Sequence, residues 1–168
     1  PISESMKPIF DAAGVKYWHL DGDRAICCGR PLLQQGFLKQ AKDLRLKNQS
    51  MIIKSKAKLL VTSCPICYQS FTKEYNLPIK VMHHTEYIAG LIKSGRLKLR
   101  KDDLKVVYHD PCELGRGCGI YDEPREVLKS VSNLVKAKDE KEKSICCGFN
   151  LGSTVLTMEQ QTKVRDAA

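Results

Sequence analysis

The chain has 168 residues, of which 42% are hydrophobic and 28% charged, and its formal net charge at pH 7 is +9. That is enough chain to bury one core or two small ones. No stretch approaches the roughly 18–20 apolar residues of a membrane-spanning helix, and no secretory leader opens the sequence, so we expect a cytoplasmic protein. The basic excess does not indicate nucleic-acid binding, because the lysines are dispersed, those over 136–143 alternate with acidic residues, and no basic platform carries aromatic side chains.

The hydrophobic pattern predicts helices and strands in alternation. The helices are expected over residues 6–13, 31–53, 87–92 and 123–131, and the strands over 15–20, 59–62 and 104–108. Cysteine motifs follow the ends of these strands. This order is typical of a parallel α/β sheet, whose ligands gather at the carboxyl ends of the strands.

All eight cysteines except Cys118 fall into two sets. In the first set, the triplet Cys27-Cys28-Gly29 is followed, 36 positions after Cys28, by Cys64-Pro65-Ile66-Cys67. In the second, Cys112 lies 34 positions before the triplet Cys146-Cys147-Gly148. Thiolates concentrated in this way favour a metal cluster over scattered core cysteines. The glycine of each triplet allows a close backbone approach and a positive φ.

The two halves look like an internal duplication, because the segment 25–32 is similar to 144–151. We predict two similar Rossmann-like parallel-sheet halves of an α/β fold, with the cysteine motifs at the carboxyl ends of strands. The first repeat covers residues 1–100 and lacks a leading cysteine. The second covers 101–168 and lacks a trailing Cys-x-x-Cys, which suggests a window cut from a longer tandem repeat.

Three alternatives to a redox cluster remain open. Four disulfides are conceivable, but they belong to small secreted scaffolds rather than to a chain with long helical patterns. The pair Cys64 and Cys67, which opens a helix, also suits a thioredoxin-like dithiol. A four-cysteine zinc site uses the same thiolate ligands as an iron–sulfur cluster and would make the chain a zinc-stabilised, non-catalytic interaction domain.

Other polar residues have ordinary and functional interpretations. His109 precedes Asp110-Pro111-Cys112 and is a candidate to protonate a leaving thiolate or to tune a cluster, although hydrogen bonding within the loop is the commoner role. We expect loop, capping, salt-bridge or free-thiol roles for His83, His84, Arg116, Arg125 and Cys118.

These motifs resemble the cysteine-rich "CCG" domain, in which a Cys-Cys-Gly triplet has a cysteine before it and a Cys-x-x-Cys after it, usually twice per chain. The domain occurs in one of the subunits of heterodisulfide reductase and in the iron–sulfur subunits of systems that oxidise glycolate, lactate or, anaerobically, glycerol-3-phosphate. The resemblance covers nearly the whole chain, including Tyr108-His109-Asp110-Pro111-Cys112 and the stretch over 119–125.

The resemblance implies that each complete repeat binds a [4Fe–4S] cluster, which is non-cubane in heterodisulfide reductase. The implied ligands are Cys27, Cys28, Cys64, Cys67, Cys112, Cys146 and Cys147. The function implied is the iron–sulfur component of a larger oxidoreductase, heterodisulfide reductase-like or 2-hydroxyacid oxidase-like, that transfers electrons or reduces a disulfide. Its partners would be ferredoxin-like or flavoprotein subunits, with no nucleic acid and with membrane association only through a partner.

Overall fold

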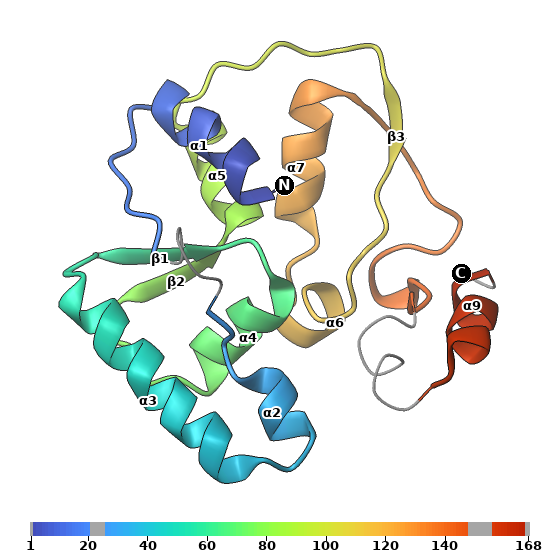
Figure 1. Cartoon of the computed structure of the whole chain (residues 1–168). Helices are drawn as coiled ribbons and strands as arrows, with labels where there is room; N and C mark the ends of the chain where they lie inside the picture. The colour runs from blue at the N-terminus through green and yellow to red at the C-terminus, as the bar shows by residue number, and fades with distance from the viewer. Residues whose placement is uncertain (1, 21–25, 148–155, 167–168) are drawn as a thin grey trace. The chain divides into compact units, whose positions relative to one another are not determined.

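The computed structural model describes residues 2–20, 26–147 and 156–166. It divides the chain into two units, residues 1–101 and residues 102–168 (Figure 1). In the described part, each unit is mixed α/β and contains one parallel sheet of two strands. No described helix combines the length and the apolar character needed to cross a membrane.

The first unit is built around the parallel pair β1 (Leu59–Thr62) and β2 (Lys80–His83), in which Leu59 lies opposite Lys80 and Thr62 opposite His83. Helix α4 (Pro65–Lys73) lies in the crossover between the two strands and contacts both. The other helices of this unit are α1 (Ile2–Ala12), α2 (Arg30–Gln34), α3 (Leu38–Lys54) and α5 (His84–Lys93). Its buried apolar side chains come mainly from α3 and α5, among them Ile52, Ile88 and Leu91.

The second unit repeats this arrangement on a smaller scale. Strand β3 (Lys105–Val107) pairs in parallel with β4 (Asn133–Val135), and α6 (Gly115–Cys118) and α7 (Asp122–Val131) lie in the crossover. The other described elements of this unit are a 3-10 turn, η1 (Lys141–Lys143), and helix α9 (Met158–Asp166). Leu114, Asp110 and Pro124 are fully buried side chains of the crossover.

Two of the predicted elements are wrong. The single helix predicted over 31–53 is interrupted, because the chain turns through Gly36, whose φ of 83° lies in the left-handed region that favours glycine. The segment predicted as a strand over 15–20 is irregular, since no described strand pairs with it and the aromatic rings of Tyr17 and Trp18 are exposed.

The junction between β2 and α5 is fixed by His83, which confirms the capping role expected there. The backbone N–H of His83 donates to Glu86 Oε2 at 2.7 Å, and His83 Nδ1 lies 2.8 Å from Thr85 Oγ1. His83 Nε2 lies 3.3 Å from the carbonyl oxygen of Ser63, at the end of β1. Burial lowers the pKa of His83 to about 4, so its ring is neutral at neutral pH.

This pKa predicts how acid affects stability. In the unfolded chain His83 takes up a proton near pH 6.5, but in the folded chain it does so only near pH 4, so acid favours the unfolded state between these values. The free energy of unfolding should fall by up to about 3 kcal/mol from this residue as the pH drops from about 6.5 to 4.

The variant His83→Asn keeps a good capping side chain and has no titrating ring. Denaturant unfolding of metal-free protein between pH 7 and pH 4 should therefore show a shallower loss of stability in the variant. An equal loss of unfolding free energy with falling pH in parent and variant would contradict the lowered pKa of His83.

Candidate functional site

Three cysteines of the first set meet at the carboxyl end of β1. Cys64 is the residue before the first turn of α4 and Cys67 lies within that turn. Cys28 arrives from the segment before α2, which contacts α4. Hydrogen bonding with Cys28 and with Cys64 shifts the pKa of Cys67, which indicates that the three side chains are neighbours, and we treat them as one group.

The electrostatics of this group assign different protonation states to its members. The hydrogen bond with Cys67 lowers the pKa of Cys28 to about 7, with help from the backbone N–H of Arg30 and the side chain of Ser70, although burial opposes the shift. The same hydrogen bond, together with Cys64 and burial, raises the pKa of Cys67. Between Cys28 and Cys67, Cys28 is therefore the first to become a thiolate, which is the form that binds metals.

Cys27 lies outside the group. Its side chain is exposed, and its sulfur accepts the backbone N–H of Gly29 at 3.4 Å. Gly29 has a φ of 89°, which confirms the positive φ expected there and turns the triplet into α2. Within the described ranges, no three Cys, His, Asp or Glu side chains already stand at the spacing of metal ligands. The metal-binding role of these cysteines stays a prediction.

A buried polar pair holds the backbone of the first triplet. Asn48 Nδ2 donates to the carbonyl oxygen of Cys27 at 2.9 Å and to Tyr75 Oη at 3.0 Å. Tyr75 Oη donates to the carbonyl oxygen of Cys28 at 2.8 Å. Neither residue is among those expected from the sequence, although Asn48 shares a helical stripe with Ala41 and Ile52. A polar residue in such an apolar stripe is the signal that points to it.

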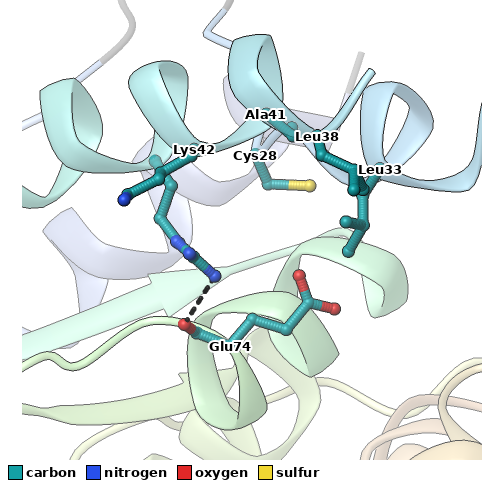
Figure 2. A pocket seen from close by; sticks show the side chains of 8 residues that line it. Cys28, Leu33, Leu38, Ala41, Lys42 and Glu74 are labelled. Carbon is teal, nitrogen blue, oxygen red and sulfur yellow. Dashed lines mark hydrogen bonds between the residues drawn. The ribbon is translucent and has the colours of Figure 1, made fainter. Parts of the chain in front are cut away.

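Glu74, at the end of α4, ties the helices around Cys28 together. Its carboxylate pairs with Arg30 and accepts the Ser70 hydroxyl at 3.1 Å, while its carbonyl oxygen accepts Arg45 at 3.2 Å. Beside the sulfur of Cys28 these helices enclose a small cavity of about 40 Å³ (Figure 2). It is lined by Cys28, Gly29, Leu33, Leu38, Ala41, Lys42, Arg45 and Glu74.

We expect Tyr75→Phe to destabilise the first unit. The change leaves the ring in place but removes the donor to Cys28 and the acceptor for Asn48, so buried polar groups lose partners. The free energy of unfolding should fall by about 1–3 kcal/mol, as measured by urea denaturation. Tyr17→Phe, which removes the same hydroxyl from an exposed ring, is the matched control. Equal effects of the two substitutions would show that the network does not hold the triplet.

In the second set, the structure brings together Cys112 and Cys146. Burial raises the pKa of Cys112, and a hydrogen bond with Cys146 adds to the shift. Cys147 is exposed, and Gly148 lies outside the described residues. Cys118 is half-buried at the end of α6, and none of the eight cysteines forms a disulfide.

Asp110 connects the two parts of the second set. Its carboxylate accepts two hydrogen bonds from the buried guanidinium of Arg125, at 2.6 and 2.7 Å, and one from the backbone N–H of Lys141 at 2.7 Å. Its carbonyl oxygen accepts the Ser144 hydroxyl at 3.1 Å. Burial alone would raise the pKa of Asp110, but Arg125 and the amide of Lys141 outweigh it and hold the pKa below its usual value. The salt-bridge role expected for Arg125 is confirmed.

Arg116 holds the segment directly before Cys146. Its guanidinium donates to the carbonyl oxygens of Ser144 at 2.6 Å and of Glu142 at 3.3 Å. This occupies Arg116 with the backbone of its own unit. His109 is exposed, and its catalytic role stays a prediction.

We expect Asp110→Asn to destabilise the second unit strongly. The amide preserves the shape but removes the charge that pairs closely with Arg125, whose buried guanidinium keeps only the longer ion pair with Glu140 at 3.4 Å. Breaking comparable buried pairs costs about 3–5 kcal/mol. Asp122→Asn is the control, because Asp122 is 72% exposed and its partner Lys141 is also accessible. Thermal unfolding of both variants checks this. The prediction fails if Asp110→Asn unfolds at the same temperature as Asp122→Asn.

The chain is similar in sequence to known proteins. The profile of the family described as "CCG: Cysteine-rich domain" matches residues 1–72 and 106–167. The EtfAB:quinone oxidoreductase of Syntrophomonas wolfei is 31% identical over 98% of this chain and 23% of its own length. One of the subunits of the dihydromethanophenazine:CoB–CoM heterodisulfide reductase of Methanosarcina mazei is 33% identical over 86% of this chain and 38% of its own. The probable iron-sulfur-binding oxidoreductase FadF of Bacillus subtilis is 36% identical over 72% of this chain.

The chain spans 18–38% of the length of these three relatives. No solved structure matches it.

Proposed function

Since the chain belongs to the family of cysteine-rich CCG domains, we propose that it transfers electrons, or reduces a disulfide, as the iron–sulfur domain of a larger oxidoreductase. The observation that carries the proposal is the group of three neighbouring thiols, those of Cys28, Cys64 and Cys67, at the carboxyl end of β1. The names of the relatives support it, since they include a heterodisulfide reductase, a quinone oxidoreductase and an iron-sulfur-binding oxidoreductase.

The donor chemistry of this group fits an iron–sulfur cluster, because it consists of sulfur atoms and includes one thiol that ionises near neutral pH. We propose that one [4Fe–4S] cluster is held by Cys27, Cys28, Cys64 and Cys67, and that a second takes ligands from Cys112, Cys146 and Cys147. When bound, such a cluster accepts and releases single electrons. The chain's own contribution is to fix the cysteine backbone through Asn48 and Tyr75 and to donate hydrogen bonds to sulfur, which tune the potential of a cluster.

The two units represent two Rossmann-like copies of one repeat, supported by the parallel strand pair and the cysteine motif in each. Ferredoxin-like or flavoprotein subunits are proposed as partners in the cytoplasm. The chain covers only part of the length of its relatives, so the electron donor and the electron acceptor are proposed as well.

The test is the metal content of the anaerobically purified protein. We expect iron and acid-labile sulfide in equal amounts, with an EPR signal on reduction. Cys28→Ser should lose the iron of the first site while Cys118→Ser keeps it, because Cys118 lies outside both sets. Cys28→Ser should lower the melting temperature only moderately, because it replaces one buried sulfur with a smaller hydroxyl and leaves the buried apolar side chains of α3 and α5 in place.

A zinc-stabilised interaction domain predicts the opposite result. Zinc without sulfide, and unfolding of Cys28→Ser in step with loss of the metal, would replace the redox proposal, because the binding energy of a structural metal is also folding energy.

A further inference from the structure

The turn between α2 and α3 exposes apolar side chains. Leu33, Phe37 and Leu38 are 38%, 46% and 64% exposed, and no residue of α2 is buried. Together with Lys39 and Lys42, on the next turn of α3, we call them the α2–α3 corner. Water contact with these side chains costs free energy in the isolated chain, and exposed apolar groups ringed by charge mark interaction surfaces.

Phe37 is an unfavourable choice for the helix that it opens. It is the residue before the first turn of α3 and supplies no side-chain cap, whereas Ser, Thr, Asp or Asn would accept a hydrogen bond from the helix there. A residue that goes against the helix-capping preference and does not stabilise its own domain is often kept for a function, such as contact with a partner. Aromatic side chains are enriched at the centres of protein interfaces.

The surroundings of the corner are strongly basic. Residues 1–101 contain 18 lysines and arginines against 7 aspartates and glutamates, whereas residues 102–168 contain 10 against 12. Over residues 30–54 there are six basic side chains and one acidic one, Asp43. Arg30 and Arg45 are bound to Glu74, which leaves Lys39 and Lys42 exposed beside the apolar side chains. A partner with complementary charge would be acidic.

The corner also adjoins the first cysteine group. Leu33, Leu38 and Lys42 line the small cavity beside the sulfur of Cys28 (Figure 2). A volume of about 40 Å³ holds little more than one water molecule, far less than the several hundred Å³ of a typical small-molecule site. The occupant of the corner is therefore a macromolecule that covers the cavity rather than a ligand that fills it.

We infer that the α2–α3 corner is the docking surface for an acidic electron-carrier protein. The apolar side chains would form the centre of the contact and the lysines its rim, as in the small, transient interfaces of redox partners. The inference deepens the proposed function and rests on it: one electron leaves the reduced carrier and one enters the cluster held at Cys28. Docking itself depends on the surface and not on the state of the cluster.

The experiment measures binding of an acidic plant-type ferredoxin to the full-length protein by calorimetry at low and at physiological salt. We expect Lys39→Glu combined with Lys42→Glu to raise the Kd about tenfold and to flatten its salt dependence. The matched control is Lys98→Glu combined with Lys101→Glu, which changes the charge of the same unit equally in the loop after α5 (Figure 1). The control should leave the Kd within about twofold of the parent.

Phe37→Ser separates docking from folding. It should weaken binding about fivefold and leave the melting temperature within about 5 °C of the parent, because the lost ring contacts are offset by a side chain that caps α3. Equal affinities for the parent, the double lysine variant and Phe37→Ser would overturn the inference, as would absence of ferredoxin binding by the parent.

Two other occupants would appear as different results. Sedimentation of the parent, but not of Phe37→Ser, with phosphatidylglycerol vesicles in place of ferredoxin binding would assign the corner to a membrane surface and overturn the inference. A parent dimer that Phe37→Ser dissociates would assign it to a second copy, with the same consequence. The metal analysis tests the proposed function independently of docking. If the protein holds iron and sulfide but the variants bind ferredoxin as the parent does, only the docking surface is refuted. If the variants bind ferredoxin more weakly but the protein holds no iron, only the proposed function is refuted.

Discussion

The hydrogen bonds from Asn48 and Tyr75 to the carbonyl oxygens of Cys27 and Cys28 are the constraint on which the first site depends. The described residues 26–28 belong to no helix or strand, so no helix or strand ladder fixes the position of the two cysteines. Two buried polar side chains, one from α3 and one from the end of α4, supply that position instead. Because each also bonds to the other, loss of either would leave buried polar groups unpaired.

In the second unit a buried ion pair, rather than neutral side chains, fixes the cysteine segment. Asp110 precedes Cys112 by two residues. Its carboxylate binds the backbone N–H of Lys141 and its backbone carbonyl oxygen binds the hydroxyl of Ser144, so this one residue positions the segment before Cys146 near Cys112. Arg125 stabilises this arrangement, since a buried carboxylate without a partner would be far costlier. The two units thus resemble each other in strands and cysteines but differ in how each triplet is held.

Local chemistry allowed much of this to be predicted from the sequence. The strand before Cys64, the helix opened by its Cys-x-x-Cys pair and the two cysteine sets follow from spacing and hydrophobic pattern. The break at Gly36 was missed because the apolar spacing continues across it, and β4 because three residues are too few for a period. Asn48 and Tyr75 bind the backbone of residues that lie 21 and 47 positions away in the sequence, and no local sequence pattern reveals such distant contacts.

The central claim is that the sulfurs gathered at the end of β1 hold iron. Anomalous diffraction from crystals of the anaerobically purified protein, collected on both sides of the iron absorption edge, tests it most directly. The account predicts an iron peak among Cys28, Cys64 and Cys67, with the side chain of Cys27 turned toward it. A peak that appears only at the zinc edge, or iron found away from these sulfurs, would contradict it.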